Sequence, residues 1–379
     1  MAFFESTGGG AAAPVFLHTY WRGRGTWIWA ALRDEERALG FYEPLHEMMA
    51  GLTAREIAGT GPGEWDSGHP AMAPYWSEFA PLLAPGQAGV PGFRLDFATE
   101  DAFVAADEPQ PALEAYLQGL LRHAEERGRV AVFKFCRSLG RAGWMRQRFP
   151  QALHVAVLRR PQALWESARR QFEANGNPYF LAMPLLLLAR NACAPTVIRS
   201  CRALHVPLPR LRQADPRRAM ATCRVMLDQL SWDDRYRAFL AFWLASALSV
   251  LAADCLFVDA DMLAWSADYR DEVAATMARA SGLAPSFASP SGGVREELPP
   301  LEPEQEAVQR AALSLLAESR AALRPQGYVL AWSQLADALV RSSLPLLAEP
   351  DEGEIAPAWA PQPRFWALSG RRAAGADRG

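Results

Sequence analysis

The stretch VFLHTYWRGRGTWIWAAL, residues 15–32, limits the possible folds more than any other part of the chain. An apolar run ends at a short loop of glycine and arginine, and an amphipathic segment follows it. A strand, a glycine loop and a helix in this order commonly bind phosphate. Gly23 and Gly25 let the backbone approach an anion, and the N–H groups of Thr26 and Trp27 point toward it at the positive end of the helix dipole. The sequence therefore predicts an anion site at this loop.

Two arginines, Arg22 and Arg24, add positive charge to the same loop. The whole chain has a net charge of −3 and lacks the basic excess of a general nucleic-acid binder, so we expect no nucleic-acid partner. The loop also lacks the pattern GxxxxGK[ST], in which a lysine reaches the terminal phosphates and a hydroxyl holds magnesium. An anionic ligand therefore has to meet a local cluster of arginines.

A second stretch, VAVLRRPQALWESARRQF at residues 155–172, has the same order of elements. An apolar strand ends at Arg159, Pro161 opens a helix, and Ser167 lies nearly two turns into that helix. Ligands of parallel sheets bind at the carboxyl ends of the strands, so both loops can line one crevice. An arginine and a hydroxyl at that place can hold a second phosphate.

Short apolar runs alternate with helical periods along the chain. Strands are expected at 15–20, 41–42, 130–136, 154–159 and 255–260, and helices at 26–39, 111–128, 139–148 and 161–173. This alternation predicts an α/β fold with a parallel central sheet flanked by helices. Helical patterns dominate afterwards, so the C-terminal half is expected to be largely helical.

We expect the chain to consist of three parts. Residues 1–285 form the α/β domain with helical insertions, residues 286–348 form a helical extension packed on it, and residues 349–379 form a loosely ordered tail. Residues 59–108 are rich in glycine, proline and aromatic residues and show no clear period. A loop of that length is usually functional, so we expect a lid or a binding wall there.

The cysteine pattern and the apolar segments indicate the cellular compartment of the protein. The five cysteines lie far apart and lack the spacing of a metal site, so we expect reduced thiols and no bound metal. The N-terminal stretch has neither the basic region nor the sustained apolar core of a signal peptide. The apolar segment 179–189 is shorter than the roughly 20 residues that span a bilayer. These features predict a cytoplasmic protein without a transmembrane segment.

In these motifs the chain resembles the sulfotransferases that use 3′-phosphoadenosine 5′-phosphosulfate (PAPS), in particular their bacterial branch with its P-loop-like fold. The family's first loop, [KR]-x-G-T-x-[WL], cradles the 5′-phosphosulfate. The resemblance assigns that role here to Arg22, Gly23, Arg24, Gly25, Thr26 and Trp27. The family's second motif, R-[DN]-P-x(5)-S, implies that Arg159 and Ser167 hold the 3′-phosphate. The expected reaction moves a sulfuryl group from PAPS to a hydroxyl or amine of a small-molecule, lipid or carbohydrate acceptor, without a metal.

The segment FYEPLHE, residues 41–47, resembles the Tyr-Glu-Pro segment that follows the first helix in the same family. The likeness implies that Glu43 is the general base of the reaction. His46 is the reserve candidate, and Glu47 is a further candidate for an orienting group. A purely structural role, bracing the turn before Pro44, is the alternative for Glu43.

Two positions depart from the family pattern. Gly23 stands where the first loop usually has its basic residue, so either Arg22 or Arg24 can contact the bridging oxygen and stabilise its charge. Arg160 stands where the second motif usually has an aspartate or an asparagine. The altered first loop leaves a non-catalytic nucleotide-binding scaffold of the same fold as an alternative.

Another alternative is an ATP-dependent phosphotransferase with Asp259 and Asp261 as its acidic metal ligands. The missing lysine and hydroxyl of GxxxxGK[ST] argue against it. Lys134, Arg137 and Arg141 lie at the end of a strand and in the following helix, where ion pairing and ligand contact explain them equally well. The sequence leaves the acceptor and the oligomeric state open, and a homo-oligomer is compatible with it.

Overall fold

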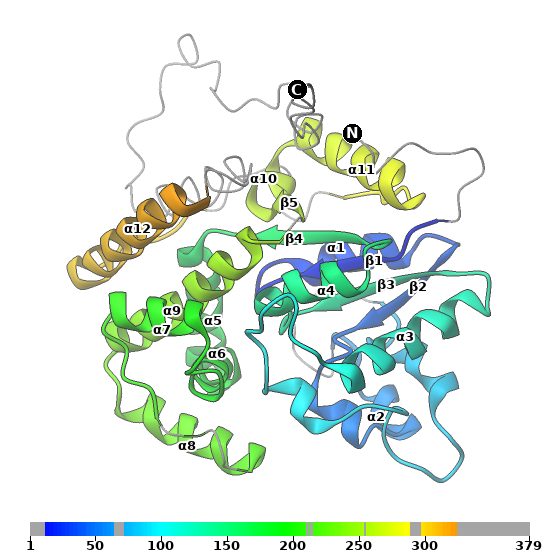
Figure 1. The fold of residues 1–379 in the computed structure, drawn as a ribbon, viewed down its shortest axis with the longest axis horizontal. Coiled ribbons are helices and arrows are strands. Elements are labelled where there is room, and N and C mark those ends of the chain that lie inside the picture. Colours follow the sequence, from blue (N-terminus) through cyan, green and yellow to red (C-terminus); the bar gives the residue numbers. More distant parts are fainter. Residues whose placement is uncertain are drawn as a thin grey trace, which may run out of the picture.

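The computed structural model describes residues 12–63, 72–209, 211, 215–253, 255–288 and 297–323. At its centre lies a five-stranded parallel sheet with the strand order β2-β3-β1-β4-β5 (Figure 1). The strands are β1 Val15–His18, β2 Ala38–Tyr42, β3 Val130–Phe135, β4 Leu153–Leu158 and β5 Leu256–Asp259. Every residue of β1, β3 and β4 is buried, as expected for parallel strands covered on both faces. The predicted parallel α/β fold is thus confirmed.

Helices flank the sheet and make up most of the described residues in the second half of the chain, as predicted (Figure 1). The first half contains α1 Gly25–Arg33, α2 Ala54–Ala58, α3 Pro111–Glu125, α4 Ala142–Arg148, α5 Pro161–Asn175 and α6 Tyr179–Arg190. The second half contains α7 Pro195–Ala203, α8 Pro216–Gln229, α9 Trp232–Leu251, α10 Ala260–Trp265, α11 Ala267–Ser281 and α12 Pro303–Leu323. Short 3₁₀ helices are η1 Glu47–Ala50, η2 Ser77–Leu82, η3 Leu95–Ala98 and η4 Leu139–Arg141.

Helix α9 is the centre of a second hydrophobic core beside the sheet. It is buried on nearly all sides and packs against α6, α7 and α12. Over the described ranges no single helix is long and apolar enough to cross a membrane, and only α6 with α7 meets that criterion, as a pair bent by 118°. All five cysteines are free thiols.

The C-terminal extension expected at 286–348 is described in part. Its helix α12 packs against α7 and α9. Residues 289–296 and 324–348 and the predicted tail 349–379 lie outside the described residues. The boundaries between the three expected parts therefore stay predictions.

The helix expected at 26–39 is shorter than predicted. It is α1, which ends at Arg33, and β2 begins at Ala38. The charged residues between them interrupt the apolar period and form a turn in which the Ala38 N–H donates to Glu35 O at 2.9 Å. Ala38 then pairs with Val130 of β3. Ala38 and Leu39, whose local pattern was also compatible with a helix, thus belong to the sheet.

The segment 59–108 packs against the sheet domain in its described part. Its buried side chains include Tyr75, Trp76, Phe79 and Phe97. Arg141 anchors its end by donating to the backbone oxygens of Phe97, Glu100 and Asp101. Arg141 therefore holds structure together, while the expected lid or binding wall stays a prediction.

Two histidines of adjacent strands form a buried hydrogen-bonded chain. His154 Nε2 lies 3.0 Å from Phe149 O, which can only accept, so this nitrogen carries the proton. His154 Nδ1 then accepts from His18 Nε2 at 3.1 Å, and His18 Nδ1 accepts from the Ser138 hydroxyl at 2.7 Å. Burial lowers the pKa of His154 to about 4 and the pKa of His18 well below its usual range. Both rings are therefore neutral near pH 7.

We predict that mild acid weakens the fold through this histidine pair. The unfolded chain binds more protons than the folded chain between the usual pKa of 6.5 and the pKa of about 4 for His154, so the free energy of unfolding falls as the pH falls through this window. Each histidine contributes a slope of at most about 1.4 kcal/mol per pH unit. Urea unfolding across this pH range measures the slope.

The variant His154→Gln isolates this effect, because the amide can still accept from His18 and donate to Phe149. Its stability should depend less on pH than that of the wild type. The exposed His205→Gln serves as the matched control. An unchanged slope in His154→Gln would contradict the prediction.

Candidate functional site

The loop between β1 and α1 is compact, and its two glycines are required by contacts within the loop. The Gly23 N–H donates to Tyr20 O at 3.1 Å, and a Cβ at Gly23 would lie 2.8 Å from that oxygen. A Cβ at Gly25 would lie 2.5 Å from the side chain of Thr19. Any side chain at either position would therefore push the loop apart.

The first turn of α1 differs from the sequence prediction in one respect. Arg24 precedes the helix with a φ of 62°, and its carbonyl oxygen accepts from the Trp27 N–H at 3.1 Å. The Trp27 N–H is therefore engaged within the turn, so the prediction that it points at an anion is wrong. For the N–H groups of Gly25 and Thr26 the described residues offer no acceptor. These two groups lie at the positive end of the α1 dipole and can bind an anion.

The two segments with predicted phosphate-binding motifs are in direct contact. Arg22 Nε donates to Ser167 Oγ at 2.9 Å, and Arg159 Nη1 donates to Arg22 O at 2.6 Å. The Arg22 guanidinium also lies over the ring of Phe180, 5.2 Å from its centroid. The carboxyl ends of β1 and β4, which pair in the sheet, bring these residues together.

Arg22 forms no ion pair with any residue in the described part of the chain. Burial lowers its pKa, and repulsion from Arg159 lowers that pKa further. A partly buried cation whose polar partner is a neutral hydroxyl gains energy when an anion binds beside it. Arg22 is therefore a suitable ligand for a phosphate or sulfate group.

Three arginines of the two segments, Arg24, Arg159 and Arg160, meet at Asp261. Arg159 Nε lies 3.3 Å and Arg24 Nη1 lies 3.5 Å from Asp261 Oδ1, and Arg160 Nε lies 3.0 Å from Oδ2. Burial would raise the pKa of Asp261, but the guanidinium groups of Arg159 and Arg160 lower it further than burial raises it. The Asp261 carboxylate is therefore ionised and binds arginines from both segments.

Asp259 and Asp261 have separate structural roles. Asp259 Oδ1 accepts from the backbone N–H groups of Asp261 and Met262 and caps α10, whereas Asp261 binds arginines. Within the described ranges no group of three or more His, Cys, Asp or Glu side chains could hold a metal ion.

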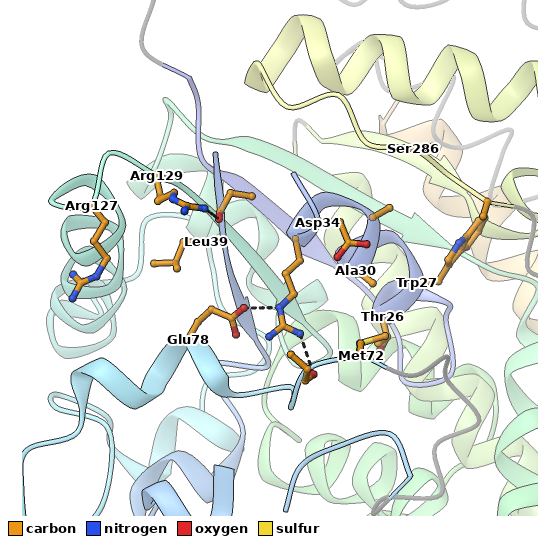
Figure 2. A pocket seen from close by; sticks show the side chains of 15 residues that line it. Thr26, Trp27, Ala30, Asp34, Leu39, Met72, Glu78, Arg127, Arg129 and Ser286 are labelled. Atoms are coloured by element: carbon orange, nitrogen blue, oxygen red, sulfur yellow. Dashed lines mark hydrogen bonds and ion pairs between the residues drawn. The ribbon is translucent and has the colours of Figure 1, made fainter. Parts of the chain in front are cut away.

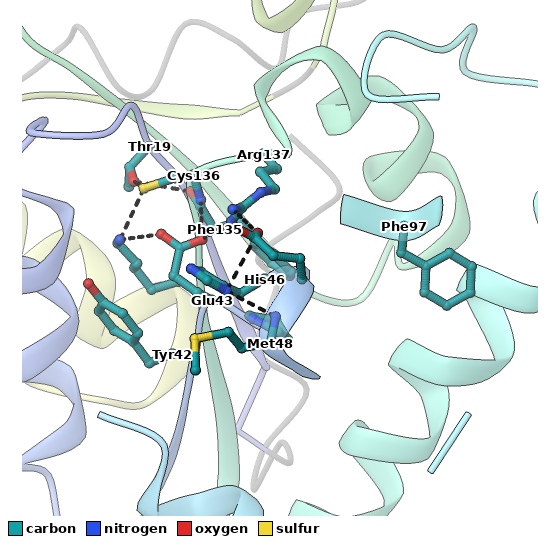
Figure 3. A network of polar contacts seen from close by, with 12 residues as sticks. Thr19, Tyr42, Glu43, His46, Met48, Phe97, Phe135, Cys136 and Arg137 are labelled. Atoms are coloured by element: carbon teal, nitrogen blue, oxygen red, sulfur yellow. Dashed lines mark hydrogen bonds and ion pairs between the residues drawn. The ribbon is translucent and has the colours of Figure 1, made fainter. Parts of the chain in front are cut away.

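Glu43 lies in a second buried network, at the end of β2 (Figure 3). Its Oε1 accepts from Lys134 Nζ at 2.5 Å. Its Oε2 accepts from the Cys136 N–H at 3.0 Å and from Arg137 Nη1 at 3.4 Å. Burial raises the pKa of Glu43, but the charges of Lys134 and Arg137 outweigh it and lower the pKa to about 2. Glu43 is therefore an ionised carboxylate surrounded by donors, in a backbone conformation with a φ of 45°.

His46 and Glu47 form the outer part of the same network. His46 Nδ1 accepts from the Met48 N–H at 3.2 Å, and His46 Nε2 lies 3.3 Å from Tyr179 Oη. Burial lowers the pKa of His46 to about 4, so the ring is neutral near pH 7. Glu47 accepts from Arg137 at 2.6 Å, and its side chain is 35% exposed. Arg137 thus links Glu43 and Glu47, and in this structure Lys134 and Arg137 serve ion pairing.

A cavity of about 770 Å³ runs along the outer face of α1 and reaches Thr26 and Trp27 (Figure 2). Its lining includes the ion pair between Arg33, at the end of α1, and Glu78 of η2, at 2.5 Å. Trp27 also lies against Phe287, with 5.9 Å between ring centroids. The cavity therefore reaches the first turn of α1, where Trp27 lines it.

Comparisons with protein-family models, with curated proteins and with solved structures find no match.

Several residues of the site carried no sequence signal for their roles. The sequence suggested Asp261 as a metal ligand, but Asp261 instead binds arginines. Tyr179 lies in an apolar segment, which gave no sign that its hydroxyl contacts Arg137. Lys134 offered a usable signal, because it is the single lysine of the chain and lies in an otherwise apolar strand. A lone buried cation requires a buried anion, and Glu43 follows the neighbouring strand.

We predict that Lys134→Met lowers the free energy of unfolding by about 3–5 kcal/mol, because it leaves the buried Glu43 carboxylate without its closest cation. The double variant Lys134→Met, Glu43→Gln should lose less than the single one. Arg94→Met, which breaks the exposed pair with Asp96, is the control and should change stability little. Urea unfolding measures all three, and a Lys134→Met variant as stable as the control would show that the pair is not important.

Proposed function

We propose that the protein is a PAPS-dependent sulfotransferase that transfers a sulfuryl group to a hydroxyl or amine of a small-molecule, lipid or carbohydrate acceptor. The observation that carries this proposal is the contact between the two phosphate-binding segments, from Arg22 to Ser167 and from Arg159 to Arg22 O. Two adjacent anion-binding elements suit a ligand with two separate phosphate groups. PAPS has such a pair and supplies an activated sulfuryl group when bound.

The residues around the α1 N-terminus suit the charge that grows on the leaving phosphate. The N–H groups of Gly25 and Thr26 and the guanidinium of Arg22 can stabilise it without rearrangement of the backbone. Arg24 is held by Asp261 at 3.5 Å, so Arg22 is the stronger candidate for the bridging oxygen. Arg159 and Ser167 would hold the 3′-phosphate.

The nucleoside can be accommodated beside the same helix. The cavity of about 770 Å³ falls within the usual ligand range of roughly 300–1,000 Å³. Trp27 lines the cavity beside Thr26, and aromatic rings are favourable partners for a base. This placement puts the nucleoside next to the predicted phosphate site.

Glu43 and His46 are the candidates for the base that takes the acceptor proton. Glu43 is ionised, and its longest contact, 3.4 Å to Arg137, is the one that an acceptor hydroxyl can replace most easily. The donors around Glu43 also reduce its basicity. His46 is neutral near pH 7 and can accept a proton on Nε2 if the tautomer changes.

One alternative function has an observation in its favour. A carboxylate with a pKa of about 2 is a weak base, which favours a nucleotide-binding scaffold without catalysis. Such a scaffold would bind 3′,5′-ADP and transfer no sulfate. A magnesium-dependent phosphotransferase has less support, because Asp261 binds arginines.

We predict that the protein binds 3′,5′-ADP more tightly than ADP. We also predict that Arg159→Ala lowers the affinity for 3′,5′-ADP about ten- to a hundredfold, as expected for the loss of a charge-assisted hydrogen bond. Isothermal titration measures both ligands. Arg169→Ala removes an arginine from α5, the helix that follows Arg159, where Arg169 pairs with Glu166, and is the matched control. Equal binding of the two nucleotides would refute the proposed function, and equal loss for both in Arg159→Ala would place Arg159 outside the 3′-phosphate site.

For the base, we predict that Glu43→Gln lowers kcat by about 10²–10⁴-fold while the affinity for 3′,5′-ADP stays nearly unchanged. Transfer from labelled PAPS to a panel of acceptors measures kcat. A Glu43→Gln variant with near wild-type kcat, together with an inactive but folded His46→Ala variant, would move the role to His46. No transfer by the wild type to any acceptor would favour the scaffold.

A further inference from the structure

Asp261 lies where the two phosphate-binding segments meet. Its Oδ1 contacts Arg159 Nε at 3.3 Å and Arg24 Nη1 at 3.5 Å. Its Oδ2 accepts from the Arg160 side chain at 3.0 Å and from the Arg160 backbone N–H at 3.1 Å. The Asp261 side chain is only 10% exposed. One buried carboxylate therefore neutralises part of the charge that both segments offer to a ligand.

This carboxylate is fixed in place. Asp259 caps the first turn of α10 by accepting from the backbone N–H groups of Asp261 and Met262. Asp259 also ends β5, where it pairs with Leu158 of β4. The backbone of Asp261 is therefore held at this edge of the sheet, and its side-chain Oδ2 accepts from the Arg160 N–H at 3.1 Å. An anion that approaches Arg24 and Arg159 meets the negative charge of Asp261.

We propose that Asp261 is a specificity-determining residue, a built-in counter-ion that keeps single small anions such as inorganic phosphate or sulfate from occupying the arginine cluster. A small anion must share Arg24 and Arg159 with Asp261 and is repelled by it. A ligand with a second anionic group can also bind Arg22 and Ser167, which contact each other. Arg22 has no contact with Asp261 among the described residues, so Asp261 does not compete for it. The identity of that larger ligand, a 3′-phosphorylated nucleotide, rests on the proposed function.

The test removes the charge of Asp261 and keeps its shape. Asp261→Asn can still accept from the Arg160 N–H, and isothermal titration with inorganic phosphate is the readout. We expect inorganic phosphate to bind the variant about tenfold more tightly than the wild type, because one fixed like charge is gone. Asp215→Asn, which removes a carboxylate that caps the separate helix α8, is the matched control and should not change phosphate binding.

A purely structural role for Asp261 predicts the opposite result. Loosened arginines would bind phosphate more weakly, and unchanged or weaker phosphate binding in a folded variant overturns the proposal. Asp261→Ser repeats the measurement if Asp261→Asn does not fold, because it also removes the charge and retains an acceptor. Tighter phosphate binding by the variant, combined with no 3′,5′-ADP binding by the wild type, would support the counter-ion role and refute the proposed nucleotide.

Discussion

Positive charge buried at the carboxyl edge of the sheet is the constraint on which the rest of the structure depends. Arginines follow β1 and β4, and Lys134 and Arg137 lie at the end of β3. A buried cation costs several kcal/mol unless an anion accompanies it. The fold supplies Glu43 on one side and Asp261 on the other, from segments far apart in the chain. Helices outside the sheet also supply partners for these cations, because α6 contributes Tyr179 and α10 contributes Asp261.

The sequence predicted those parts of the fold that have local causes. Glycine marks the loop between β1 and α1, and proline marks the start of α5. The apolar runs of β1, β3 and β4 identify strands buried on both faces. The end of α1 was predicted wrongly, because Ala38 and Leu39 were compatible with a helix as well as with a strand, although the charged residues before them interrupt the apolar period. Only the position of Val130 in the folded sheet decides between the two.

For the site, the sequence identified candidate residues but not their partners. Arg159 and Ser167 could be selected from one motif, whereas the contact of Arg159 with Asp261 joins positions 102 residues apart. The left-handed backbone of Arg24, whose carbonyl oxygen accepts from the Trp27 N–H, carried no signal in the sequence. The ion pair between Lys134 and Glu43 likewise forms only when β2 and β3 are paired.

The central place of β1 in the sheet also sets an order of events during synthesis. Val15 pairs with Val132 on one side and with Leu153 on the other, so both edges of β1 stay open while the intervening chain is made. At a translation rate of about 5–20 residues per second, the nascent chain carries an exposed apolar strand for several seconds. The loop between β1 and α1 gains its contact with Asp261 later still, after β5 and α10 have been made. β1 is therefore paired on both edges, and its loop is complete, only after most of the described chain has been synthesised.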